Sequence, residues 1–102
     1  MTSDRTQFPG DEATVALEEL LAVSRLAREE LLELVELGAF EPVAAGEAWR
    51  FSSRAIVQAR RAARLRDDFG LNAPGMALAL AYLERIDELE RRLRELECRL
   101  LR

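Results

Sequence analysis

The architecture of the chain follows from one stretch, VSRLAREELLELVELGAFEP, at residues 23–42. A short turn at 24–26 separates the apolar segment 15–23 from a second segment, 28–37, which stops at Gly38. Apolar residues recur at helical spacing in both segments, and glycine suits the left-handed position that follows a helix end. The stretch therefore predicts two short helices joined by a tight turn, which is a helix–turn–helix.

The second predicted helix has two contrasting sides. At roughly 100° per residue, one side should pack against the first helix and carries Leu31, Leu34, Val35 and Gly38. The opposite side carries three carboxylates around one leucine, and we call it the acidic face: Glu29, Leu32, Glu33 and Glu36. A DNA-reading helix would press these carboxylates toward phosphates, which occur every ~1.7 Å of duplex. The pattern argues against direct DNA binding through this face.

Two interpretations of the acidic face stay open. It is either a solvated charged surface, which is common on exposed helices, or a docking surface for a basic protein. Leu32 favours docking, because an apolar side chain inside a polar rim is typical of protein interfaces. The net charge of −4 also disfavours a general nucleic-acid role.

Residues 39–51 change period and predict a small two-stranded wing, in which Trp49 and Phe51 point into the core. A third helix is expected at 53–68, with Ser52-Ser53 as its cap.

The third helix carries a row of arginines: Arg54, Arg60, Arg61 and Arg64. We expect this row to pair within the chain, through Arg64 with Asp68 and through bridges to glutamates of the last helix. Arg66 lies near the apolar side of the helix, so if it is buried it needs a carboxylate or backbone carbonyls.

The last helix begins at an Asn72 cap, has Pro74 in its first turn, and continues to Arg102. Apolar residues repeat along it at spacings of 4, 3, 4, 3 and 4, the a/d pattern of a coiled coil: Tyr82, Ile86, Leu89, Leu93, Leu96 and Leu100. This a/d row either packs on the chain's own domain or pairs two copies. We expect a homodimer, because the row is too long for so small a domain to cover.

The charges that flank the a/d row bear on the direction of the pair. In a parallel dimer Arg85 would face the partner's Glu90, and Arg92 would face the partner's Glu97. An antiparallel dimer would oppose arginines. The charges lean toward the parallel arrangement, but exposed ion pairs are worth under about 1 kcal/mol each, so both directions stay open.

The sequence carries no catalytic apparatus. Histidine is absent, which removes the usual general base and the commonest metal ligand. The lone cysteine, Cys98, falls on the outer f position of the heptad, and no Gly-rich phosphate loop or Cys-x-x-Cys pair occurs. We expect no enzyme activity, no cofactor and no metal site.

Cysteine usage and hydropathy indicate the compartment. A single cysteine fits a reducing cytoplasm, and no secretory signal begins the chain. The longest apolar run, 76–83, is far shorter than the roughly 20 residues of a membrane helix. We expect a cytoplasmic protein without membrane association.

The order of these elements resembles the winged helix–turn–helix of MerR-type regulators. LGAFEP followed by WRF resembles their Gly-Leu-x-x-Pro and Tyr-Arg-x-Tyr pattern. A closer resemblance is to the CbpM chaperone modulators, carried by residues 28–42, 49–51, 61–69 and 71–80. One departure is Ala27, where a Ser or Asp cap would be expected.

The resemblance implies an all-α fold: a MerR-like winged helix–turn–helix with a small two-stranded wing and a long C-terminal coiled-coil helix. The residues themselves divide the chain into a flexible N-terminal tail at 1–13, which is polar and broken by Pro9-Gly10, a winged helix–turn–helix domain at 14–72 and a dimerisation helix at 73–102.

The resemblance also implies a function. CbpM proteins bind the J-domain of a DnaJ-like co-chaperone of the CbpA type, and they inhibit its Hsp70 co-chaperone and DNA-binding activities. A J-domain docks on Hsp70 through a basic helix, which Glu29, Glu33 and Glu36 would suit. The protein could then reach the nucleoid through its partner. The rival interpretations are a MerR-type DNA-binding transcriptional regulator that uses the arginine row or the wing, and an effector-binding module.

Overall fold

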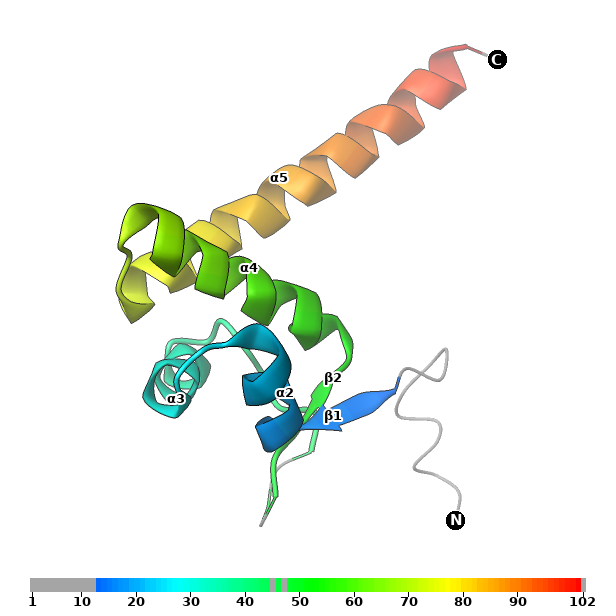
Figure 1. Ribbon diagram of the computed structural model, residues 1–102. Coiled ribbons are helices and arrows are strands. Elements are labelled where there is room, and N and C mark those ends of the chain that lie inside the picture. The colour runs from blue at the N-terminus through cyan, green and yellow to red at the C-terminus, as the bar shows by residue number, and fades with distance from the viewer. Residues whose placement is uncertain (1–12, 45, 47, 102) are drawn as a thin grey trace, which may run out of the picture.

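The computed structural model describes residues 13–44, 46 and 48–101 (Figure 1). The elements follow in the order β1 (Thr14–Ala16), α2 (Leu17–Ser24), α3 (Arg28–Glu36), β2 (Arg50–Ser52), α4 (Arg54–Phe69) and α5 (Ala73–Leu100). The predicted fold class is confirmed: the chain is mostly helical, with one small antiparallel sheet and a long C-terminal helix. The predicted tail, 1–13, lies outside the described residues except for Ala13.

The sheet is assembled differently from the predicted wing. β1 pairs antiparallel with β2, and Val15 lies opposite Phe51. Among the described residues of 39–51, the pairing is limited to an isolated bridge between Ala44 and Arg50. The expectations that a helix begins at Val15 and that both strands lie within 39–51 are therefore wrong.

Local hydrogen bonds explain why residues 14–16 are extended. The Arg50 guanidinium donates to Thr14 Oγ1 at 2.9 Å and to the Thr14 carbonyl at 3.1 Å, which holds β1 against β2. The Glu19 carboxylate then accepts the Ala16 N–H at 2.9 Å. This acceptor satisfies a free donor at the helix start, so α2 begins after Ala16 rather than at Val15.

The turn between α2 and α3 has the expected helix–turn–helix form. Arg25 adopts a left-handed conformation with φ of 70° and donates its N–H to the Leu21 carbonyl at 3.1 Å. The buried Ser24 hydroxyl accepts the Leu26 N–H at 3.2 Å. At the start of α3, Glu30 accepts the Ala27 N–H at 2.9 Å. Glu30 thus satisfies the N–H of the cap residue, while Ala27 has no side-chain acceptor to offer to the N–H groups of the first turn.

The core lies where α2, α3, α4 and the first turns of α5 meet. Its largest fully buried side chains include Phe51, Leu20, Leu31, Leu34 and Met76. Phe51 points into the core as predicted. Trp49 is only half-buried and packs against the outside of the core.

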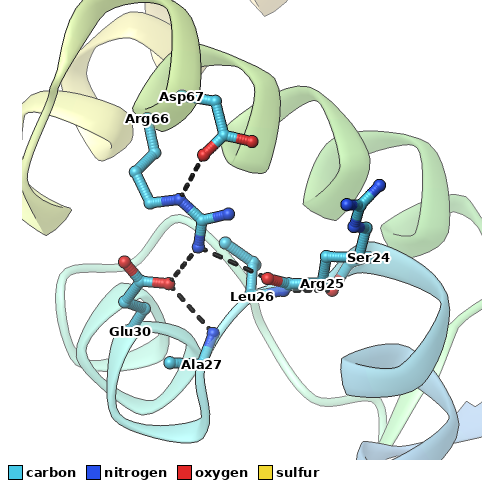
Figure 2. Close-up of polar contacts among 7 residues, drawn as sticks. All are labelled: Ser24, Arg25, Leu26, Ala27, Glu30, Arg66 and Asp67. Carbon is cyan, nitrogen blue, oxygen red and sulfur yellow. Dashed lines mark hydrogen bonds and ion pairs between the residues drawn. The ribbon is translucent and has the colours of Figure 1, made fainter.

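The Arg66 guanidinium contacts three oxygen atoms, one on its own helix and two in the α2–α3 region, as Figure 2 shows. Its Nη1 lies 2.6 Å from Glu30 Oε1 and 3.4 Å from the Arg25 carbonyl oxygen, while its Nε lies 2.9 Å from Asp67 Oδ1. The hydrogen bond to Asp67 is the main cause that raises the pKa of Arg66, and Glu30 adds to it against the opposing effect of burial. The expectation that this side chain needs a carboxylate or backbone carbonyls is confirmed.

The arginine row of α4 is partly engaged within the chain. Arg61 Nη1 lies 3.4 Å from Asp87 Oδ2 of α5, and Arg60 Nε donates to the Val23 carbonyl at 3.3 Å. Arg61 thus pairs with the last helix as expected, but its partner is the aspartate Asp87 and not one of the predicted glutamates. The predicted Arg64–Asp68 ion pair is wrong, because no contact joins these two side chains in the described part of the chain.

Helix α5 begins as predicted, with Asn72 Oδ1 accepting the Gly75 N–H at 2.9 Å. Its first turns bury Ala73, Met76 and Leu80, whereas every residue from 89 to 101 is exposed. Figure 1 shows the C-terminal half of α5 extending away from all other elements.

Candidate protein-binding site

Helix α3 presents the acidic face on its outer side. Leu31 and Leu34 are fully buried beneath it, which turns Glu29, Glu33 and Glu36 outward. Leu32 lies among these carboxylates and is 36 % exposed, so it is available for contact. The predicted sidedness of α3 is therefore confirmed at its centre.

The end of α3 departs from that prediction. Gly38, which was expected to pack against the first helix, is exposed with φ of 86°. It lines a small cavity with Ala77 and Leu80 of α5. Gly38 has a left-handed backbone conformation and lies after the end of α3. The rotation of about 100° per residue that places side chains on a helix therefore does not apply to it.

The carboxylates of the acidic face are free to act on a partner. Within the described part of the chain, Glu29, Glu33 and Glu36 have no hydrogen-bond or ion-pair partner. The neighbouring glutamates of the same domain are engaged: Glu18 pairs with Arg28, and Glu30 pairs with Arg66. Three unpaired carboxylates on a short helix create a local negative potential that attracts cationic groups.

An open groove of about 400 Å³ lies beside the acidic face. Its walls come from the β1–α2 junction, from α3 and from the segment before β2: Ala16, Leu17, Glu18, Leu32, Gly46, Ala48 and Trp49. Leu32 belongs to both the groove and the acidic face, so the two are continuous. We call this feature the Leu32 groove.

Sequence reasoning missed the Leu32 groove because its three segments are far apart in the chain. In addition, Trp49 was expected to point into the core and not to line a surface groove. The signal that could have suggested a groove was the pair of small residues, Gly46 and Ala48, next to a tryptophan.

The a/d row of α5 forms a second candidate surface. Its six side chains are between 46 % and 83 % exposed: Tyr82, Ile86, Leu89, Leu93, Leu96 and Leu100. Beside it, Arg85 and Arg92 both bind Glu88 of their own helix, at 3.0 Å and 3.1 Å. A continuous apolar row of this length is unusual on the surface of a small domain.

The described residues contain no group of three or more histidine, cysteine, aspartate or glutamate side chains arranged to hold a metal ion. Cys98 is an exposed free thiol on the outer side of α5. No helix in the described part of the chain is long and apolar enough to cross a membrane.

The fold and these surfaces define a helix–turn–helix protein whose second helix carries carboxylates instead of a basic reading surface. The family described as MerR HTH family regulatory protein matches residues 15–98.

Sequence similarity to curated proteins identifies one group within this family. The chaperone modulatory protein CbpM of Coxiella burnetii is 38 % identical over 82 residues, which cover 79 % of this chain and 77 % of the relative. CbpM of Salmonella arizonae is 39 % identical over 90 residues, covering 87 % and 89 %. CbpM of Salmonella paratyphi B is 40 % identical over 72 residues, covering 70 % and 71 %. The chain belongs to the CbpM chaperone modulatory proteins of the MerR helix–turn–helix family, which are regulators and not enzymes.

Proposed function

We propose that this protein binds the J-domain of a DnaJ-like co-chaperone of the CbpA type and inhibits its Hsp70 co-chaperone and DNA-binding activities. The relatives that are named chaperone modulatory proteins support a role in the chaperone system. The observation that carries the proposal is the set of unpaired carboxylates, Glu29, Glu33 and Glu36, around the exposed Leu32.

The proposed mechanism is occlusion. The basic J-domain helix that engages Hsp70 is complementary in charge to the acidic face, and one surface cannot serve both partners at once. Complementary charges steer the encounter and disfavour wrong partners, and Leu32 adds an apolar contact among the carboxylates. The protein acts in the cytoplasm, with access to the nucleoid through its partner.

The proposed active form is a homodimer that pairs through the a/d row of α5. In this assignment residues 14–72 form the docking domain and residues 73–102 the dimerisation helix. The exposed apolar row supports pairing, since association would remove it from water. A dimer would present two acidic faces to the partner.

The experiment that tests this function uses the full chain and an isolated J-domain of the CbpA type. Calorimetric titration should show saturable binding, and the same concentrations should reduce J-domain stimulation of Hsp70 ATP hydrolysis. A J-domain with its basic helix residues changed to alanine serves as the control and should bind much more weakly. Absence of heat and of inhibition with the native J-domain would contradict the proposal.

A further inference from the structure

We infer that the Leu32 groove receives an apolar side chain from the same basic helix that contacts the acidic face. This inference rests on the proposed function and adds a specificity determinant to it. It assigns a binding role to Leu17, Ala48 and Trp49, which lie outside α3 and line the groove with Leu32.

The composition of the groove selects an apolar occupant. Six of its seven lining residues are apolar or glycine, and Glu18 is the single charged one. Its volume is about 400 Å³, which falls within the range of about 300–1,000 Å³ that is typical of small-molecule pockets. The groove therefore has room for an aliphatic or aromatic side chain and would hold a charged one only at a desolvation cost.

The charges beside the groove indicate which residues should flank the apolar side chain in the partner. Glu29 and Glu33 are exposed and unpaired on α3, while Glu18 at the rim is bound to Arg28. The net charge beside the groove is therefore negative. An apolar side chain with lysine or arginine one helical turn away matches this arrangement, and an acidic segment would be repelled.

Trp49 gives the groove a fixed wall. The Trp49 ring meets the Phe51 ring edge-on, with centroids 6.2 Å apart and planes at 83°, and Phe51 is buried in the core. This contact limits the freedom of the tryptophan before any partner arrives. A preformed apolar wall loses little side-chain entropy on binding, which is characteristic of interface residues that dominate affinity.

The test fills the groove without disturbing the core. Ala48 is exposed, so Ala48→Phe adds a ring to the groove, and we expect J-domain affinity to fall by about tenfold or more. The matched control is Ala81→Phe, because Ala81 is also exposed and lines the separate cavity near Gly38. This control should bind as tightly as the native protein.

A second pair of variants covers the case in which Ala48→Phe perturbs the fold. Leu32→Ala removes an apolar wall at an exposed position of α3 and should also weaken binding. Leu37→Ala, an exposed leucine just after the same helix on the other cavity, should not. Circular dichroism should show unchanged helical content for all four variants.

The outcomes separate this inference from the proposed function. Native-like affinity in both Ala48→Phe and Leu32→Ala, together with weaker binding on charge reversal of Glu33, would overturn the groove and keep the acidic face. Equal losses in Ala48→Phe and Ala81→Phe would also overturn it, because the effect would not be specific to the groove. No J-domain binding by the native protein would overturn both. If an apolar dye binds in the groove and leaves J-domain affinity unchanged, the groove would instead be assigned to a small molecule.

Discussion

Arg66 Nη1 lies 2.6 Å from Glu30 Oε1, and that same oxygen accepts the Ala27 N–H at 2.9 Å (Figure 2). One carboxylate thus completes the N-terminus of α3 and ties this helix to α4. The acidic face lies on α3, so its orientation relative to the rest of the domain depends on this contact.

Removing the Arg66 side chain should destabilise the protein. We expect Arg66→Ala to lower the free energy of unfolding by about 1–2 kcal/mol, because Glu30 and the Arg25 carbonyl both lose a charged donor in a partly buried site. Urea denaturation followed by circular dichroism measures the change. Arg64→Ala on the same helix is the control and should alter stability by less than about 0.5 kcal/mol. Equal midpoints for the two variants would contradict this prediction.

The stabilisation by Arg66 should not vary with mildly alkaline pH. Its pKa is raised in the folded state, mainly by the hydrogen bond to Asp67. A raised folded pKa contributes stability that is present below the unfolded pKa and is lost only as pH rises through the folded value, which is strongly alkaline here. The stability difference between native protein and Arg66→Ala should therefore stay constant from roughly pH 7 to 10. A difference that disappears within this range would show that another group controls the contact.

Binding to the J-domain should weaken as salt is added. Exposed charges are screened beyond about 10 Å at 0.1 M ionic strength and beyond about 3 Å at 1 M. We expect the dissociation constant to rise several-fold between about 50 and 300 mM NaCl, mostly through a slower association rate. Stopped-flow kinetics at several salt concentrations measures this. An association rate that is independent of salt would argue against charge steering by the acidic face.

A charge in the a/d row should separate the proposed dimer. Leu93→Glu places a carboxylate in the middle of the a/d row, so the apparent mass should fall from two chains to one in size-exclusion chromatography with light scattering. Arg91→Glu, on the outer f position, introduces a carboxylate without touching the row and should leave the dimer intact. A monomeric native protein, or a Leu93→Glu variant that stays dimeric, would refute pairing through this row.

The isolated protein should bind duplex DNA weakly. The carboxylates of α3 face outward, and Arg60 and Arg61 of the arginine row already contact Val23 and Asp87. Fluorescence anisotropy with mixed-sequence duplexes at low salt should show no saturable binding at micromolar protein. Tight binding would instead support a MerR-type transcriptional regulator.

Local signals explain why so much of the fold could be predicted from the sequence. The glycine at 38 and the Asn72 cap each act over a few residues, and the structure contains the helix end and the helix start that they predict. The alternation of buried Leu31 and exposed Glu33 likewise follows from helix geometry alone.

Contacts between distant segments explain what could not be predicted. The pairing of Val15 with Phe51 joins residues 36 positions apart, and the sequence near Val15 does not indicate which residue it pairs with. The Leu32 groove likewise needs Leu17 and Trp49 to be brought together by the sheet and α3. Arg64 and Asp68 have the spacing of an ion pair, yet exposed pairs gain too little to be formed reliably.

Recognition of a basic protein surface by the acidic face should depend on its three carboxylates. Calorimetric titration of the triple variant Glu29→Arg, Glu33→Arg, Glu36→Arg against the J-domain measures this dependence. Glu95→Arg, an exposed reversal on the outer side of α5, is the control for the change of charge. We expect the triple variant to lose J-domain binding and Glu95→Arg to retain it. Equal, native-like affinity in both proteins would show that the acidic face is not the binding surface.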